Sequence, residues 1–193
     1  MYNFATIYEE FQPRIKRYLG SLAGEDAACD LTQAVFLKVS QSLDSFRGES
    51  SLATWLYRIA TNLAHDHGAS APVKQQKLEH LLAEGESLDD LPDSASAATD
   101  SAYIRQEMNA CIREVVVGLP ESYRTVLLLV EFEELTNQEA AEVLGISLET
   151  VKIRLHRARQ ILRRAMQNQC SFYRDERNEL MCDRIPQDTK ISA

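Results

Sequence analysis

The sequence predicts an all-α protein of two small helical domains that are joined by a flexible acidic linker. Apolar residues recur at three- and four-residue steps over most of the chain, as they do on amphipathic helices. The 193 residues include only seven glycines and five prolines. An acidic stretch separates the two helical parts, which gives domains at residues 1–68 and 101–168, a linker at 69–100 and a tail at 169–193.

Composition limits the function classes. The formal net charge of -8 argues against indiscriminate nucleic-acid binding, because the field of the whole molecule repels a polyanion. No apolar run approaches the roughly 20 residues that span a bilayer, and the N-terminus lacks the pattern of a signal peptide. We therefore expect a cytoplasmic protein without direct membrane insertion. In that reducing compartment four widely spaced cysteines are expected to be free thiols: Cys29, Cys111, Cys170 and Cys182.

Three helices are predicted in the first domain. The first covers about residues 2–19, and Pro13 is expected to kink or split it. A turn follows from Gly20 to Gly24. The second helix runs from about Glu25 to Leu43. Its core-facing residues are expected to be Ala28, Leu31, Val35, Phe36, Val39 and Leu43, and its outward-facing residues Asp30, Gln33, Lys38 and Gln41. The third helix runs from about Leu52 to His67. The buried stripe of the third helix is expected to comprise Leu52, Trp55, Leu56, Ile59, Ala60 and Leu63.

The linker is recognised by its charge, since acids outnumber lysines seven to two between residues 69 and 100. A helix is predicted to open the second domain near Ser101 and to end at Gly118. The next helix is expected to begin with Pro120 at its first position and to run to about Glu131.

A helix-turn-helix pattern follows. Thr136 and Glu139 have the spacing of a capping box, and Gly145 stands where a left-handed C-cap belongs. Ser147 is expected to cap the last helix. Two helices joined by so short a turn are typical of DNA-binding modules.

The last helix, Ser147 to Arg164, is the most basic part of the chain. It carries six lysines and arginines against the single acid Glu149. One narrow arc of the helix is apolar, and it comprises Leu148, Val151, Leu155, Ala158 and Leu162. The opposite arc and its flanks are polar and basic. This pattern favours insertion into a DNA major groove over the alternative, a short helical hairpin with a solvated basic face.

Particular residues of this helix are candidate DNA contacts. Lys152, Arg154 and Arg157 suit guanine edges or phosphates, and Ile153 suits a thymine methyl group.

The loop from Phe46 to Ser51 is a second candidate site, because an aromatic ring and backbone donors beside Trp55 can hold an unstacked base. From the residues alone, burial of Phe46 and Trp55 in a core is the stronger interpretation.

Several motifs together resemble bacterial sigma factors of the extracytoplasmic-function group. Asp44-Ser45-Phe46-Arg47-Gly48-Glu49-Ser50, with Thr54 to Ala60 and Asn62, resembles their region 2, and Asp30-Leu31-x-Gln33-x-x-Phe36 resembles their polymerase-core-binding stretch. Three blocks resemble their region 4: Leu119-Pro120-Glu121, the Leu135–Gly145 block, and Thr150-Val151-Lys152-x-Arg154-Leu155-x-Arg157-Ala158-Arg159. The match covers about residues 2–166, with both halves in order.

The resemblance implies a specificity subunit of RNA polymerase without a catalytic site, cofactor or metal of its own. Such a protein binds core RNA polymerase, directs it to promoter DNA and promotes melting to initiate transcription of a stress or signal regulon. An anti-sigma factor is a further implied partner. By this resemblance the first domain is a region 2 helix bundle, and the second domain is a region 4 helix-turn-helix.

The resemblance also assigns site residues. It implies core binding through an outward face around Asp30, Leu31, Gln33 and Phe36. It implies recognition of the minus-ten element, with capture of a flipped base, through Phe46, Arg47, Gly48, Glu49, Ser50, Trp55, Arg58 and Asn62. It implies recognition of the minus-thirty-five element through Thr150, Lys152, Ile153, Arg154, His156 and Arg157.

Two departures from the family pattern bear on function. The family continues after Asp66 with several basic residues, whereas this chain is basic only at Lys74 and Lys77, so we expect a weaker phosphate grip near the melted DNA. In the tail, Cys170 and Cys182 are candidates for a redox or metal switch, but two cysteines twelve residues apart without a matching His/Cys cluster are poor evidence for a metal site.

Two other classes of protein are alternatives. A response regulator or repressor would use the same helix-turn-helix without polymerase, but residues 1–68 do not resemble a receiver or ligand domain. A hydrolase or transferase would need a nucleophile–base pair, a phosphate loop or a metal cluster, and the sequence suggests none.

Overall fold

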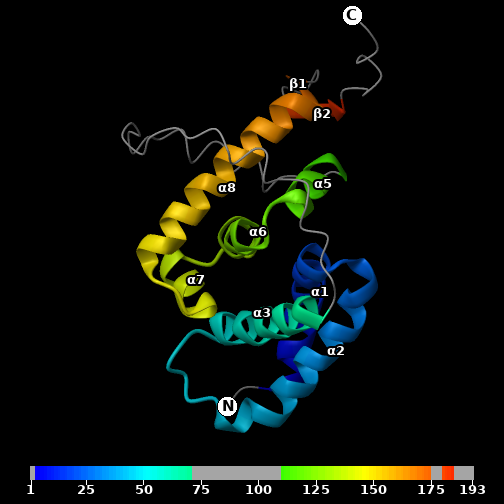
Figure 1. Ribbon diagram of the computed structural model, residues 1–193. Helices are drawn as coiled ribbons and strands as arrows, with labels where there is room; N and C mark the ends of the chain where they lie inside the picture. Colours follow the sequence, from blue (N-terminus) through cyan, green and yellow to red (C-terminus); the bar gives the residue numbers. More distant parts are fainter. Residues whose placement is uncertain (1–2, 71–109, 175–179, 185–193) are drawn as a thin grey trace, which may run out of the picture.

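The computed structural model describes residues 3–70, 110–174 and 180–184 (Figure 1). The side chains of residues 69–70, 110–111, 113–114 and 168–169 and of the final strands lie outside this description, as do the predicted linker beyond residue 70 and the predicted helix start at 101–109. The elements in order are α1 (Phe4–Ala23), α2 (Glu25–Ser42), the 3-10 turn η1 (Leu43–Ser45), α3 (Leu52–Ser70), α5 (Ala110–Gly118), α6 (Glu121–Leu127), the π-helical turn η3 (Leu128–Phe132), α7 (Asn137–Leu144), α8 (Leu148–Gln169), β1 (Cys170–Arg174) and β2 (Leu180–Arg184).

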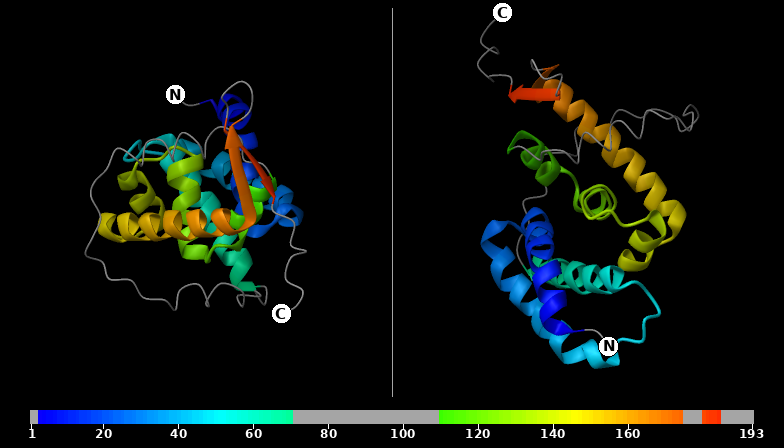
Figure 2. Two further views of the ribbon diagram at one scale, coloured as in Figure 1. Left: turned by 90° about the horizontal axis from the view of Figure 1, so that it is seen from above. Right: turned by 180° about the vertical axis from the view of Figure 1, so that it is seen from behind.

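The helical class is confirmed, and the tail adds a feature that the sequence did not predict. Residues 170–174 and 180–184 pair as an antiparallel hairpin. Its register places Cys170 opposite Arg184 and Cys182 opposite Phe172, so the two cysteines are not cross-strand partners. Both views in Figure 2 show the hairpin at the end of α8.

The first helix differs from the prediction at both of its special residues. α1 is continuous through Pro13, which is exposed, while Phe11 and Ile15 on either side of it are buried and anchor the helix. It also continues through Gly20, which was predicted to lie in a turn. A Cβ at Gly20 would lie 3.1 Å from Oε1 of Glu25, so the small residue permits close packing there. The chain turns only at Gly24, with a φ of 92°.

The buried stripe of α3 is rotated from the predicted one. Leu56 and Ala60 are buried as expected, but so are Tyr57 and Ala64, which were not predicted. Leu52, Trp55, Ile59 and Leu63 are only partly buried. The reason is tertiary, because α3 packs against α1 and α2 on one side and against α7 on the other. Figure 1 shows α3 lying between these helices.

The second half is organised around α8, which packs along α5, α6 and α7. Pro120 is the N-cap of α6 rather than its first residue, and the predicted helix to Glu131 ends as the η3 turn. The predicted capping box is confirmed, because Glu139 N donates to Thr136 Oγ1 at 3.2 Å and Thr136 N donates to Glu139 Oε2 at 2.9 Å. Gly145 is left-handed, with a φ of 63°.

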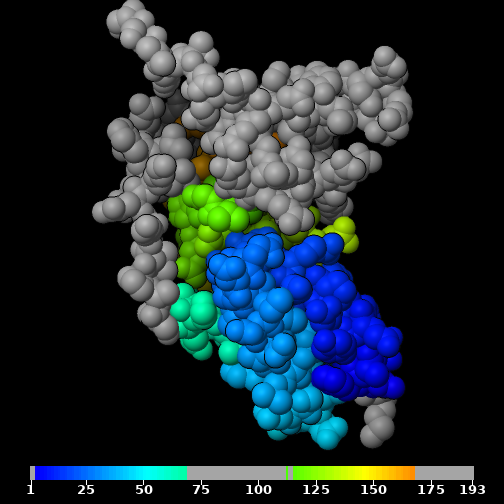
Figure 3. Space-filling view, turned by 90° about the vertical axis from the view of Figure 1, so that its right-hand side faces the viewer, coloured from blue at the N-terminus to red at the C-terminus, as the bar shows by residue number. Residues whose placement is uncertain are grey.

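The boundaries of the predicted division fall inside helices, since α3 runs past residue 68 to Ser70 and α8 runs past residue 168 to Gln169. The two halves are also in direct contact. In Figure 3 the blue surface of α1 and α2 borders the green surface of the second half.

Candidate nucleic-acid interface

The basic helix α8 is fixed in the second half by its apolar arc. Val151, Leu155, Ala158 and Leu162 are buried as predicted, whereas Leu148 at the start of the helix is exposed. Burial of this arc leaves the opposite face free to meet another molecule.

Six residues of α8 were predicted to contact DNA, and the structure divides them by exposure. Lys152, Ile153 and Arg157 are exposed, whereas Thr150, Arg154 and His156 are partly buried. Thr150 also has a local role, because its backbone N–H donates to Ser147 Oγ at 3.1 Å and the two hydroxyls are 2.8 Å apart. The predicted cap at Ser147 is thus present, and it fixes the first turn of the helix.

A buried ion pair that the sequence did not predict orients the same helix. Arg159 Nε donates to Glu131 Oε1 at 2.9 Å, and Nη2 contacts the same oxygen. The Glu131 side chain is 1% exposed and that of Arg159 is 35% exposed. Arg159 therefore faces the interior of the second half. The available sequence signal was an acid, Glu131, that follows the apolar run Leu127–Val130 directly.

The loop before α3 holds its two aromatic residues against each other. The ring centroids of Phe46 and Trp55 lie 4.9 Å apart at 33°, and both side chains are partly buried, not enclosed in the core. Gly48 adopts a φ of 71°, which only glycine tolerates without strain.

The rest of the predicted minus-ten set is mostly accessible. Arg47, Gly48 and Glu49 are exposed, and Ser50 is partly buried. The Arg47–Glu49 pair is 3.9 Å apart between exposed side chains, a geometry that stabilises little. On α3, Arg58 and Asn62 are exposed and share a helix face with Trp55.

The residues that were predicted to bind core RNA polymerase differ in their exposure. Asp30 and Gln33 are exposed on α2, but Leu31 is buried and Phe36 is only 3% exposed. The core position that the periodicity predicts for Leu31 and Phe36 is therefore confirmed, and the outward position that the resemblance implies for Phe36 is wrong. Its ring packs edge-on against Tyr8, with centroids 4.8 Å apart. Leu37, which is 60% exposed, instead shares the face of Gln33.

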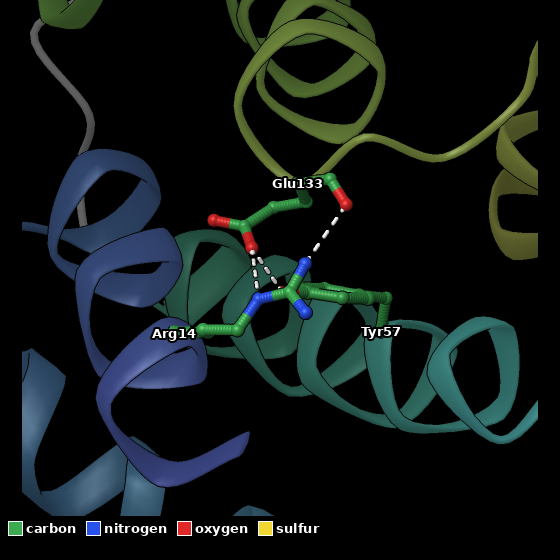
Figure 4. A network of polar contacts seen from close by, with 3 residues as sticks. All are labelled: Arg14, Tyr57 and Glu133. Atoms are coloured by element: carbon green, nitrogen blue, oxygen red, sulfur yellow. Dashed lines mark hydrogen bonds and ion pairs between the residues drawn. The ribbon is translucent and has the colours of Figure 1, made fainter. Parts of the chain in front are cut away.

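Polar groups from both halves converge on Glu133, which follows the η3 turn (Figure 4). Arg14 of α1 donates from Nε to Oε2 at 3.3 Å and from Nη2 to the backbone oxygen of Glu133 at 3.0 Å. Tyr57 of α3 donates its hydroxyl to Oε2. Burial raises the pKa of Glu133 although Tyr57 and Arg14 both favour its charged form, and burial also raises the pKa of Tyr57.

A second contact joins the halves at the helix-turn-helix. The Oε1 atom of Glu139 accepts hydrogen bonds from Ser51 Oγ at 3.0 Å and from Thr54 Oγ1 at 3.4 Å. Ser51 in turn accepts from the backbone N–H of Thr54 at 3.1 Å, so it caps α3. The start of α3, just after the candidate base-holding loop, is therefore bonded to α7.

Within the described ranges, no group of three or more His, Cys, Asp or Glu residues is arranged to hold a metal ion. In the same part of the chain no helix has the length and apolarity to cross a membrane. Cys29 is an exposed free thiol.

Comparison with known proteins identifies both halves. The model of Sigma-70 region 2 matches residues 7–71, and that of Sigma-70 region 4 matches residues 109–162. The chain is 30% identical over 172 residues to the ECF RNA polymerase sigma factor SigW of Bacillus subtilis, which covers 86% of this chain and 89% of that protein. It is 37% identical over 145 residues to the RNA polymerase sigma-H factor of Pseudomonas aeruginosa, covering 72% and 73%.

Solved structures share the fold. The sigma factor RpoE of Bartonella quintana, in complex with the anti-sigma factor NepR, superposes with a TM-score of 0.64 at 22% identity, covering 85% of this chain and 96% of that one. CnrH, in complex with the cytosolic domain of CnrY, gives a TM-score of 0.59 at 20% identity, covering 86% and 88%.

Proposed function

This chain belongs to the extracytoplasmic-function group of RNA polymerase sigma factors, so it directs transcription initiation as a specificity subunit, and we propose how its surfaces divide that work. The polymerase supplies the chemistry, and the sigma chain supplies recognition and melting without a catalytic site of its own.

The minus-thirty-five element is read by α8. The observation that carries this assignment is a helix with one arc buried and a basic, exposed opposite face at Lys152, Ile153 and Arg157. A helix presented in this way fits the major groove, with arginine and lysine on guanine edges or phosphates and the isoleucine on a thymine methyl group. Thr150, Arg154 and His156 are partly buried and contact the edges of the same site.

The minus-ten element is captured by the loop before α3. A Phe46 ring that rests on Trp55 at the surface offers an aromatic platform for an unstacked base, and Gly48 leaves the loop backbone accessible. Arg47, Glu49 and Ser50 line the loop, and Arg58 and Asn62 extend the site along α3. Stacking requires single-stranded DNA, so this surface acts once the duplex has opened.

Core RNA polymerase is bound by the exposed face of α2 that carries Asp30 and Gln33. Leu31 and Phe36 support that face from the core and do not touch the partner. The exposed Leu37 supplies apolar area on the same side. Affinity for the core enzyme explains how a chain of net charge -8 works on DNA through one basic helix.

Regulation by an anti-sigma factor in the cytoplasm completes the proposal. The structure of RpoE contains the anti-sigma factor NepR, and that of CnrH contains the cytosolic domain of CnrY.

The purified chain, mixed with core RNA polymerase, should start transcripts at a discrete genomic promoter. Core enzyme alone and the chain alone are the controls. If the chain protects an operator by itself and leaves the core enzyme inert, it acts as a regulator, and the proposal fails.

A further inference from the structure

Two large side chains of the first half are exposed beside the proposed polymerase-binding face. Tyr8 of α1 is 44% exposed and Leu37 of α2 is 60% exposed. We propose that these two side chains are the apolar anchors of the interface with core RNA polymerase, which then spans both helices, and that the buried Phe36 positions Tyr8 in it. The proposal rests on the proposed function, because it adds residues to the face that carries Asp30 and Gln33.

The two anchors belong to one continuous surface. The Tyr8 ring packs edge-on against the Phe36 ring, with centroids 4.8 Å apart and planes at 66°. Gln33 precedes Phe36 by three positions and Leu37 by four, so it lies beside both of them on α2. The surface therefore leads from Tyr8, past the Phe36 ring, to Gln33 and Leu37. In Figure 3 the surface of α1 (dark blue) adjoins that of α2 (lighter blue).

The Tyr8 ring is held in place before a partner arrives. Ile7 and Phe11, its neighbours on α1, are buried, as is Phe36 beneath the ring, so the core fixes the backbone on both sides of the contact. Edge-to-face packing at this distance is a favoured geometry for two aromatic rings. A ring that is already ordered loses little conformational freedom on binding, which is one reason why tyrosine often dominates the energy of an interface. Phe36 thus acts on the interface through Tyr8.

The chemistry of this surface fits a protein partner and does not fit nucleic acid. Tyr8 and Leu37 are uncharged, and the charged residue of the proposed face, Asp30, is an acid. DNA binding depends on cations that neutralise phosphates. The one basic residue of α2, Lys38, follows Phe36 by two positions and so projects from nearly the opposite side of the helix. Aromatic and aliphatic side chains within a polar rim are typical of the buried part of a protein–protein interface.

The position of Gln33 selects core RNA polymerase as that protein. A stable interface buries about 800 Å² on each partner, which is far more than the side chains of Asp30 and Gln33 can supply. A polymerase surface that covers Gln33 must therefore extend over its neighbours. Tyr8 and Leu37 lie on either side of Gln33 and offer the apolar area that is needed.

The anchors are tested by titrating the labelled full-length chain with core RNA polymerase and measuring the dissociation constant by fluorescence anisotropy. Tyr8→Ala should weaken binding by about 30-fold and Leu37→Ala by about 10-fold, which correspond to about 2 and 1.4 kcal/mol. Tyr8→Phe should bind like the wild type, because it keeps the ring. The matched control is Val117→Ala, which removes a 50% exposed apolar side chain from α5 and should leave binding unchanged.

Unchanged dissociation constants for Tyr8→Ala and Leu37→Ala would overturn the inference. If Asp30→Ala and Gln33→Ala still weaken binding in that case, the proposed core-binding face stands without its apolar extension. A wild-type chain that does not bind core enzyme overturns the proposed function and this inference with it. An equal loss in Val117→Ala also overturns the inference, because exposed apolar area would then matter wherever it lies.

The positioning role of Phe36 is tested by a double-mutant cycle on the same titration. Phe36→Leu keeps a buried apolar side chain and removes the ring that supports Tyr8. It should weaken binding several-fold in the wild-type background and have no further effect in the Tyr8→Ala background, because the two residues act as one unit. Equal losses in both backgrounds would show that Phe36 affects binding through the fold and not through Tyr8.

A second copy of this chain is the alternative occupant of the same surface. Sedimentation velocity of the free wild-type chain, at the concentrations of the titration, should give a monomer. A wild-type dimer that Tyr8→Ala converts to a monomer would assign the surface to self-association and overturn the inference.

Discussion

Arg159 of the recognition helix donates from Nε to Oε1 of Glu131 at 2.9 Å, across 28 positions of sequence. Because Glu131 lies in the η3 turn and is 1% exposed, the pair fixes the rotation of α8 about its own axis relative to α6. The face that α8 offers to DNA is thus set by an ion pair as well as by its apolar arc.

The substitution Arg159→Met should destabilise the second half by about 3 kcal/mol, because it deprives a buried carboxylate of its cation. The double substitution Glu131→Leu/Arg159→Leu should recover most of that loss, since replacing both charges removes the desolvation cost. Urea unfolding monitored by circular dichroism measures both. A single substitution as stable as wild type would show that the pair contributes nothing.

Local features of the helix-turn-helix were predictable from sequence, whereas contacts between distant residues were not. The capping box at Thr136, the left-handed Gly145 and the cap at Ser147 each depend on residues a few positions apart, and all three are present. Tyr57 was missed because its hydroxyl is satisfied by Glu133, 76 positions away. No helical periodicity can reveal such a partner.

The candidate sites, too, were predictable from the sequence only as far as local motifs reach. The Phe46 loop and the basic helix were located by motif, but exposure within each set depends on packing. Periodicity placed Phe36 in the core, where it packs against Tyr8 of another helix, but the family motif assigned it to the binding face, and the exposed neighbour on that helix is Leu37. The hairpin at the end of α8 lies in the segment that was predicted only as a tail.

Arg157→Ala should weaken recognition of the minus-thirty-five element by about 1–3 kcal/mol and lower the salt dependence of binding, because it removes one arginine from the groove-facing surface. Stability should not change, since Arg157 is exposed. Transcription from promoters with and without the upstream element measures the effect. The control is Gln160→Ala, exposed on the same helix. Loss of core binding by Arg157→Ala would contradict its assignment.

Asp30→Ala and Gln33→Ala should each lower the affinity for core RNA polymerase and leave the fold intact, because both side chains are exposed on α2. Fluorescence titration of the labelled chain with core enzyme measures the dissociation constant. Lys38→Ala, an exposed substitution on the same helix, is the control. Unchanged affinity in both variants would remove this face from the interface.

The stability of the folded chain should fall as the pH rises above the ordinary carboxyl value. Burial raises the pKa of Glu133 above 4.5, so the folded chain holds this proton more tightly than an unfolded chain with a solvated carboxyl. The contribution of Glu133 is therefore fully present below the ordinary pKa and is lost as the pH rises through the raised one. The titratable and charged groups around Glu133 are Arg14, Arg17, Tyr18, Tyr57 and Glu134.

The pKa of Glu139 is lowered, chiefly by the hydrogen bond from the Thr136 backbone, so its contribution to stability is present above the ordinary carboxyl value and is lost only as the pH falls below that value. Urea unfolding measured across the pH range above 4.5 reports the change that is due to Glu133. Glu133→Gln should flatten the profile. An unchanged profile in that variant would assign the dependence to another group.

Phe46→Ala distinguishes the two interpretations of the aromatic loop. If Phe46 stacks on a flipped base, its loss should weaken the open promoter complex by about 1–3 kcal/mol, because the base loses its platform. Binding to the upstream duplex should be unaffected. Permanganate footprinting of melted thymines measures the open complex, and Phe4→Ala, a partly exposed ring on α1, is the control. If Phe46→Ala instead lowers Tm and leaves melting unchanged, the Phe46–Trp55 contact is structural, and base capture must be assigned to other residues of the loop.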